Sequence, residues 1–225
     1  MMPSGIFITG TDTNIGKTWV TVALMRRLQQ MGLKVAGMKP VAAGCEWRDG
    51  QLINQDALLI QKHTVPEPAY QLVNPYAFEP AVSPHLACGE TEVRMETILA
   101  AFDSLHAQAE IVVVEGAGGW LSPLSPNFDN AGLAQTMRLP VILVVGMRLG
   151  CINHASLTYQ AICRSGVDCI GWVAVEITAD MTGFQANLNF LKQKIEAPLL
   201  GVMPHLPTPD FDFLATRFKF GQNLI

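Results

Sequence analysis

The sequence lacks paired cysteines, an excess of charge of either sign, and long apolar runs. Its five cysteines are scattered and contain no C-x-x-C pair, which argues against a disulfide framework and against a zinc site. They are Cys45, Cys88, Cys151, Cys163 and Cys169. We therefore expect reduced thiols and a cytoplasmic location.

Charged residues are few and nearly balanced. The 225 residues include 15 basic and 19 acidic side chains, so the chain lacks the excess positive charge typical of proteins that bind nucleic acid or anionic membranes. The longest apolar runs, residues 111–114 and 141–145, are far too short to cross a bilayer, and we expect no signal peptide. Hydrophobic residues make up 49%, enough for a substantial core, and we expect one domain over residues 1–225.

Short apolar runs alternate with amphipathic helical patterns. Unbroken apolar runs indicate strands buried on both faces of a parallel sheet, and their alternation with helices indicates βαβ units. We predict a doubly wound α/β fold, a mostly parallel sheet flanked by helices, with strands at residues 6–9, 34–38, 111–115, 141–145, 170–175 and 199–203. The predicted helices are residues 17–31, 55–63, 93–108, 131–138, 152–164 and 183–195.

Two segments break this alternation. Residues 64–91 are rich in proline and polar turn residues, and they predict a long loop of the kind that often carries function. The tail from residue 204 is similarly irregular, and we expect its last residues to be poorly ordered.

The first strand leads into the sequence GTDTNIGKT at residues 10–18. It ends in Gly16, Lys17 and Thr18 as a P-loop does, but Thr11 stands where the G-x-x-x-x-G-K-[ST] pattern has its first glycine. Between a strand and a helix, the backbone N–H groups and the helix dipole converge on one point. We predict a phosphate site of the P-loop NTPase kind, in which Lys17 reaches the outer phosphates and Thr18 holds Mg²⁺.

Further charged residues lie at strand ends, where ligands gather in open α/β sheets. Glu115 ends one strand and is an expected Mg²⁺ ligand. Asp56 is either a second ligand or an ordinary acid in the first turn of a helix. Lys39 is either a solvated strand end or a second positive charge over the phosphates. The small residues after Glu115, which let a nucleotide approach the backbone, are Gly116, Ala117 and Gly118.

From residue 5 to about 207, the chain resembles the dethiobiotin synthetases of biotin biosynthesis. The similar segments are residues 10–18, 37–44, 54–61, 74–85, 114–124, 139–158, 171–174 and 197–204. The resemblance implies a ligase that converts 7,8-diaminopelargonic acid, CO₂ (or bicarbonate) and Mg·ATP to dethiobiotin, ADP and phosphate. One amine would capture CO₂ as a carbamate, whose oxygen attacks the γ-phosphate to give a carbamic–phosphoric anhydride. The second amine would then close the ring.

The resemblance also implies roles for particular residues. Lys17 and Lys39 would flank the γ-phosphate and the carbamate, and Thr13 would touch both phosphate and the diamino acid. Thr18, Asp56 and Glu115 would bind Mg²⁺. The other implied nucleotide contacts are Asn14, Ile15, Gly16, Gly116, Ala117 and Gly118 near the phosphates, and Val175, Glu176, Pro204, His205 and Leu206 near the adenine.

A second subunit is implied at the far end of the substrate. In the family, the substrate carboxylate is held at the N-terminus of a helix from the partner of a homodimer, which here would be Gly150, Cys151, Ile152 and Asn153. Free N–H groups and the helix dipole suit an anion there. We interpret Cys151 as a small buried residue and not as a nucleophile.

Two positions depart from the family pattern. Ala43 stands where the motif K-P-V-x-S-G has serine, so one hydroxyl near the substrate is missing. Val175, followed by Glu176, stands where many relatives carry an asparagine that reads the adenine edge.

Three other interpretations remain open. A P-loop ATPase switch of the partitioning or septum-positioning kind is disfavoured, because the loop lacks an extra lysine at its start and the tail lacks a basic amphipathic helix. An amide-forming synthetase would need a glutaminase domain that 225 residues do not accommodate. An inactive paralogue that only binds nucleotide is supported by Ala43 and Val175, although both lysines and all three expected metal ligands are present.

Val175 predicts relaxed selection of the nucleobase. Valine can only pack against a base, whereas an asparagine amide pairs a donor and an acceptor with it, and losing such pairs weakens discrimination. We expect turnover with several nucleoside triphosphates, measured as kcat/KM for ATP, GTP and CTP. A strong preference for ATP over the other two would show that another residue reads the base.

Overall fold

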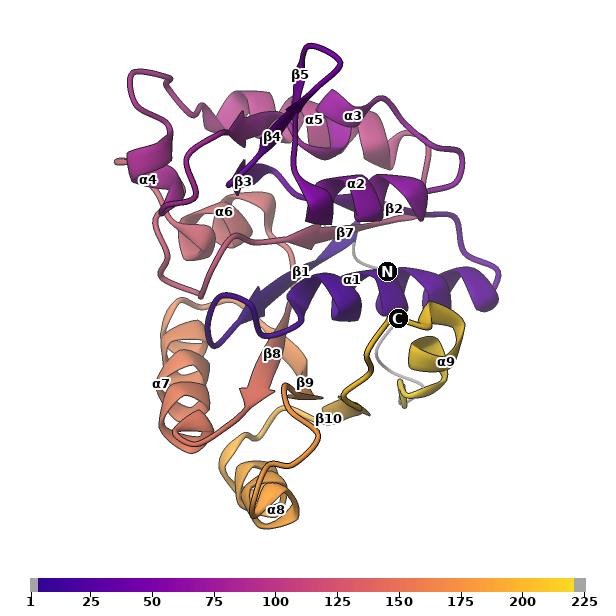
Figure 1. Ribbon diagram of the computed structural model, residues 1–225, viewed down its shortest axis with the longest axis vertical. Coiled ribbons are helices and arrows are strands. Elements are labelled where there is room, and N and C mark those ends of the chain that lie inside the picture. The colour runs from indigo at the N-terminus through magenta and orange to yellow at the C-terminus, as the bar shows by residue number, and fades with distance from the viewer. Residues whose placement is uncertain (1–3, 221–225) are drawn as a thin grey trace.

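A computed structural model describes residues 4–220, and its centre is a six-stranded parallel sheet (Figure 1). The strands are β1 (Gly5–Gly10), β2 (Val35–Met38), β7 (Ile111–Glu115), β8 (Val141–Met147), β9 (Cys169–Glu176) and β10 (Leu199–Met203). Their order is β10-β9-β8-β1-β7-β2, and all five neighbouring pairs are parallel. The predicted doubly wound α/β fold and its six strands are confirmed.

The helices cover the sheet on both faces. They are α1 (Lys17–Gln30), α2 (Gln55–Lys62), α5 (Met95–His106), α6 (Asn130–Met137), α7 (Cys151–Arg164) and α8 (Phe184–Lys194). Successive strand residues point to opposite faces, so β1 sends Phe7 into one core with α5 to α8, and Ile6 and Ile8 into the other with α1 and α2. Burial on both faces explains why the strands are apolar without alternation.

The prediction of one long loop over residues 64–91 is wrong in part. This segment contains α3 (Tyr70–Val73), β6 (Tyr76–Phe78) and α4 (Pro84–Ala87). β6 pairs in parallel with β3 (Val41–Ala43), which follows β2 after a break at Lys39 and Pro40. The segment forms structure because it bonds to a distant stretch of chain, a contact that its own proline-rich sequence does not indicate.

A β-hairpin and a short helix in the tail were not predicted from the sequence. β4 (Glu46–Arg48) and β5 (Gln51–Ile53) form a hairpin whose turn, Asp49-Gly50, has positive φ angles of 49° and 80°. Such a two-residue turn is a recognised hairpin signal. In the tail, α9 (Phe211–Thr216) begins at Asp210, whose side chain accepts a hydrogen bond from the backbone N–H of Phe213. The last residues, expected to be poorly ordered, lie outside the described part from residue 221 onward.

The strand order brings the carboxyl ends of β1, β7 and β2 close together. β1 lies between β7 and β8, and β2 lies on the far side of β7. The parallel register pairs Met38 with Val114, which places Lys39 beside Glu115. Within residues 4–220, no helix is long and apolar enough to span a membrane.

Candidate functional site

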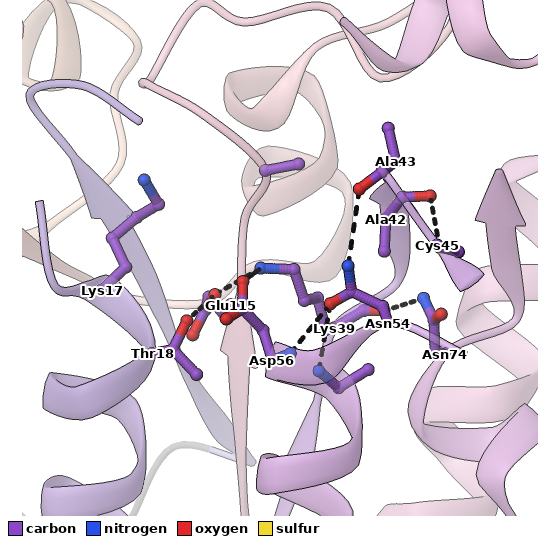
Figure 2. A network of polar contacts seen from close by, with 12 residues as sticks. Lys17, Thr18, Lys39, Ala42, Ala43, Cys45, Asn54, Asp56, Asn74 and Glu115 are labelled. Atoms are coloured by element: carbon purple, nitrogen blue, oxygen red, sulfur yellow. Dashed lines mark hydrogen bonds and ion pairs between the residues drawn. The ribbon is translucent and has the colours of Figure 1, made fainter. Parts of the chain in front are cut away.

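Lys39 lies between two carboxylates that come from different elements. Its Nζ atom is 2.6 Å from Oε1 of Glu115, at the end of β7, and 2.8 Å from Oδ2 of Asp56, in the first turn of α2 (Figure 2). Lys39 and Glu115 are buried, whereas the Asp56 side chain is 47% exposed. The sequence left open whether Lys39 is a solvated strand end and whether Asp56 is an ordinary acid in the first turn of a helix. The ion pair between them shows that neither description is sufficient.

The charges of this cluster stabilise one another. Burial alone would lower the pKa of Lys39, but the carboxylates of Glu115 and Asp56 outweigh burial and hold that pKa above its usual value. Burial would likewise raise the pKa of Asp56, but Lys39 outweighs it and holds that pKa below its usual value. The Lys39–Asp56 pair is therefore ionised at neutral pH.

The cluster has the donor set that suits Mg²⁺. The Thr18 hydroxyl donates a hydrogen bond of 2.9 Å to Oε1 of Glu115. The other oxygen, Oε2, is buried and has no hydrogen-bond partner within residues 4–220. A buried carboxylate oxygen without a donor is costly unless it binds a ligand. Two carboxylates and a hydroxyl beside a phosphate loop are oxygen ligands of the kind that Mg²⁺ prefers, so Thr18, Asp56 and Glu115 fit this ion.

The first residue of the loop between β1 and α1 is hydrogen-bonded to β8. These bonds explain why threonine and not glycine occupies position 11. The backbone N–H of Thr11 bonds to the Val144 carbonyl at 3.0 Å, and its hydroxyl accepts a 3.3 Å bond from the N–H of Gly146. A glycine could not make the second bond. At the other end of the loop, Gly16 precedes α1 with a left-handed φ of 88°, a conformation that favours glycine.

Lys17 is buried but is oriented differently from Lys39. Its Nζ donates a 2.6 Å hydrogen bond to the backbone carbonyl of Asp12, and Figure 2 shows it apart from the cluster around Glu115. The Asp12 carboxylate pairs with Arg148. Burial lowers the pKa of Lys17 to about 8, although the carboxylate of Glu115 opposes this shift. Among the described residues, Lys17 thus has no direct ionic partner of the kind that Lys39 has.

A cavity of about 740 Å³ opens above the loop and the cluster. The predicted site residues that line it are Thr13, Asn14, Ile15, Gly16, Lys17, Thr18, Lys39, Ala43, Asp56, Glu115, Ala117 and Gly118. Sequence reasoning missed the remaining lining residues, Trp19, Ala42, Asn54, Ala81, Val82, Ser83, Pro84 and Ser122. Asn54 could have been found, because an asparagine before a helical pattern is a typical N-cap.

A smaller cavity of about 230 Å³ lies on the other side of the loop. The residues that line it include Val175, Glu176, Pro204, His205 and Leu206. The remaining lining residues are Asn14, Ile15, Gly16, Trp19, Val20, Ile177 and Met203. Four residues line both cavities, namely Asn14, Ile15, Gly16 and Trp19. The two cavities therefore adjoin at the start of α1.

Some predicted residues lie elsewhere. Gly116 lies outside both cavity linings and packs so closely that an added Cβ would come within 2.5 Å of the Asn130 side chain. Gly150, Cys151, Ile152 and Asn153 form the start of α7, also outside both linings. The Cys151 side chain is buried, as interpreted from the sequence.

Comparison with known proteins identifies the family. A family model described as "AAA domain" matches residues 4–210. The proteins named ATP-dependent dethiobiotin synthetase BioD from Xylella fastidiosa and from Aromatoleum aromaticum are both 47% identical to this chain, over 209 and 210 residues. These alignments cover 92% of this chain and 92% and 93% of the two relatives. The chain belongs to the dethiobiotin synthetase family. It is therefore an enzyme of the ligase class, as predicted.

Solved structures of lower identity show the same fold. The MinC:MinD cell division complex of Aquifex aeolicus matches with a TM-score of 0.56 and 15% identity over 95% of this chain and 86% of that one. A ParA family ATPase from Chlorobium tepidum matches with a TM-score of 0.55 and 11% identity over 91% and 86%. This chain thus shares its fold with these two proteins, and identity this low shows the fold alone.

Removal of Lys39 tests the cluster. We expect Lys39→Ala to lower the kcat of the ATP-dependent ligase reaction by more than about tenfold and to change nucleotide affinity little. The reason is that an ammonium beside developing negative charge acts mainly on the transition state. Broken buried pairs cost about 3–5 kcal/mol, so circular dichroism should verify folding at the assay temperature. Lys62→Ala, at an exposed lysine on α2, is the control. A near-wild-type rate would remove Lys39 from the catalytic residues.

Proposed function

We propose that this chain catalyses the ATP- and Mg²⁺-dependent carboxylation and ring closure of 7,8-diaminopelargonic acid to dethiobiotin. The observation that carries the proposal is the convergence of Lys39, Asp56, Glu115 and Thr18 beside a P-loop, within a cavity that extends to Ala43 and Ser83. A triphosphate alone would not need this extension. The relatives' name, ATP-dependent dethiobiotin synthetase, supports the same reaction.

The nucleotide would occupy both cavities. The loop's N–H groups and the N-terminus of α1 suit the phosphates, and the smaller cavity suits the base. Trp19, which lines both, stands where the ribose and the base would lie. Bound through Thr18, Asp56 and Glu115, Mg²⁺ would neutralise part of the charge on the phosphate oxygens.

The chain's own residues would act by positioning and charge. Lys39 would hold the carbamate close to the γ-phosphate, since its ammonium lies at the boundary between the loop and the rest of the cavity. Lys17 would exchange the Asp12 carbonyl for phosphate oxygens, a change that favours its charged form. Thr13, exposed on the loop, would contact both reactants. Such a route needs no covalent bond between enzyme and substrate.

A homodimer would complete the substrate site. Leu149 is 96% exposed beside the start of α7, and Leu157 on the same helix is also exposed. Val82 and Leu86 are exposed in and next to α4, which lies on the same side of the molecule as α7 in Figure 1. Exposed apolar side chains on one side of a molecule are typical of subunit interfaces. They support the proposal that the partner's residues Gly150 to Asn153 bind the substrate carboxylate.

The assay that tests the proposed function is direct. Protein, Mg·ATP, bicarbonate and 7,8-diaminopelargonic acid are incubated together, and we expect dethiobiotin by mass spectrometry, with none formed when any component is omitted. Phosphate release that does not depend on the diamine would instead favour an ATPase switch. Nucleotide binding with neither product would favour an inactive paralogue.

Ala43 lines the larger cavity next to Ala42 and Asn54, so a serine there would place a hydroxyl in the cavity wall. One neutral hydrogen bond contributes about 0.5–1.5 kcal/mol, and we expect Ala43→Ser to lower the KM for the diamine several-fold. Ala107→Ser, at an exposed position after α5, is the matched control. An unchanged or higher KM would count against contact between Ala43 and the substrate.

A further inference from the structure

Lys39 follows the end of an edge strand, so the hydrogen bonds of the sheet do not fix its backbone. β2 ends at Met38 and is the outermost strand of the six, so only β7 flanks it within the sheet. On the open side, the backbone N–H of Lys39 bonds to the Val73 carbonyl at 2.8 Å. The Lys39 carbonyl accepts a 2.7 Å bond from Nδ2 of Asn74. The end of α3 thus holds both polar backbone groups of Lys39.

The Tyr70 hydroxyl orients the Asn74 amide. It donates a 3.0 Å hydrogen bond to Oδ1 of Asn74, which leaves Nδ2 to face the carbonyls of Lys39 and Tyr76. Burial raises the pKa of Tyr70, so the hydroxyl keeps its proton and remains a donor. Tyr70 and Asn74 are only 7% and 3% exposed, so bulk water is poorly placed to replace this bond.

The same hydroxyl also holds the start of α2. It accepts a 2.8 Å hydrogen bond from the backbone N–H of Asn54. Oδ1 of Asn54 caps α2 by accepting bonds from the N–H groups of Asp56 and Ala57, at 3.1 and 3.2 Å. Nδ2 of Asn54 faces the carbonyl of Ala43 at 3.4 Å (Figure 2). One hydroxyl thus connects the segments that carry Asp56 and Ala43 to the segment that carries Lys39.

We propose that Tyr70 is a positioning residue for the reaction. Through its hydrogen bonds to Asn74 and Asn54, its hydroxyl fixes the position of Lys39 relative to Asp56. The proposal rests on the proposed function, because it concerns the rate of that reaction. Tyr70 itself lines neither cavity, so it acts only through these two asparagines. An ion pair between groups on separate elements is effective only where both backbones are fixed, and small displacements of catalytic groups strongly reduce rate.

The substitution Tyr70→Phe removes only this hydroxyl. We expect kcat to fall by about 5- to 30-fold and the Mg²⁺ concentration for half-maximal rate to rise several-fold, because Asp56 is displaced. The KM for ATP should stay within about twofold of wild type, since the contacts with the base are remote from the change. The split between kcat and the KM for ATP separates mispositioning from general loss of folded protein.

Tyr159→Phe is the matched control. The Tyr159 hydroxyl accepts a 3.2 Å bond from the backbone N–H of Ala197, so both variants leave a backbone N–H without its tyrosine partner. We expect the control to retain kcat within about twofold at a temperature well below both melting transitions. A Tyr70→Phe rate no lower than that of Tyr159→Phe would overturn the proposal.

Asn74→Ala provides a second variant if Tyr70→Phe does not fold. It removes the bond to the Lys39 carbonyl, and we expect a similar loss of kcat. Where both fold, the double variant should lose less than the product of the two single losses, because both act on the same bonds. Fully multiplicative losses would show that Tyr70 does not act through Asn74.

A readout without turnover keeps this proposal distinct from the proposed function. Calorimetry with a non-hydrolysable ATP analogue measures nucleotide affinity over a series of Mg²⁺ concentrations. We expect Tyr70→Phe to raise several-fold the Mg²⁺ concentration that gives half of the gain in affinity, and Tyr159→Phe to leave that concentration unchanged. If wild-type protein forms no dethiobiotin, the proposed function fails, whereas an unchanged Mg²⁺ concentration in Tyr70→Phe would refute the positioning role alone.

Discussion

The ammonium of Lys39 between the carboxylates of Glu115 and Asp56 is the interaction on which the rest of the site depends. Buried charges are tolerated only when they are paired with good geometry. Here the three charges come from the residue after β2, from β7 and from α2, which are widely separated along the chain. Any arrangement that separates them leaves Glu115 buried without a cation. The fold is therefore constrained to bring three segments to one point, and the same point adjoins the phosphate loop.

The order of the sheet divides the site into two halves. β2 and β7 lie on one side of β1, and Lys39 and Glu115 lie at their carboxyl ends. β8, β9 and β10 lie on the other side, and residues at the ends of β9 and β10 line the smaller cavity. The loop after β1 lies between the halves and lines both cavities. A ligand that contacts both cavities must therefore pass the loop, as a nucleotide does in a doubly wound fold. Substitutions near Val175 therefore alter the smaller cavity, which contains none of the residues in the cluster around Lys39.

The sequence predicted what depends on local pattern. Buried apolar runs located all six strands, and the ends of those runs pointed to Lys39 and Glu115. What it missed depends on contacts between distant segments. Tyr70 and Asn74 lie in a stretch whose prolines indicate a loop, and the bonds that connect them to Lys39 join segments far apart in the sequence. Asp56 could be an ordinary acid in a helix until Lys39 was found 2.8 Å away. The role proposed for Gly150 to Asn153 would involve a second chain, which one sequence cannot position.

The two buried lysines differ in what a ligand can change. Lys39 is bound by two carboxylates and keeps a raised pKa, so its charge is constant before any substrate arrives. Within residues 4–220, Lys17 is held only by the Asp12 carbonyl, and burial lowers its pKa to about 8. A neutral carbonyl is a weaker partner for an ammonium than a phosphate oxygen, so in the proposed function an incoming triphosphate would displace it at little cost. Under that proposal Lys39 would be preorganised for the transferred group, Lys17 would respond to the nucleotide, and the site would bind ATP without first breaking its central ion pair.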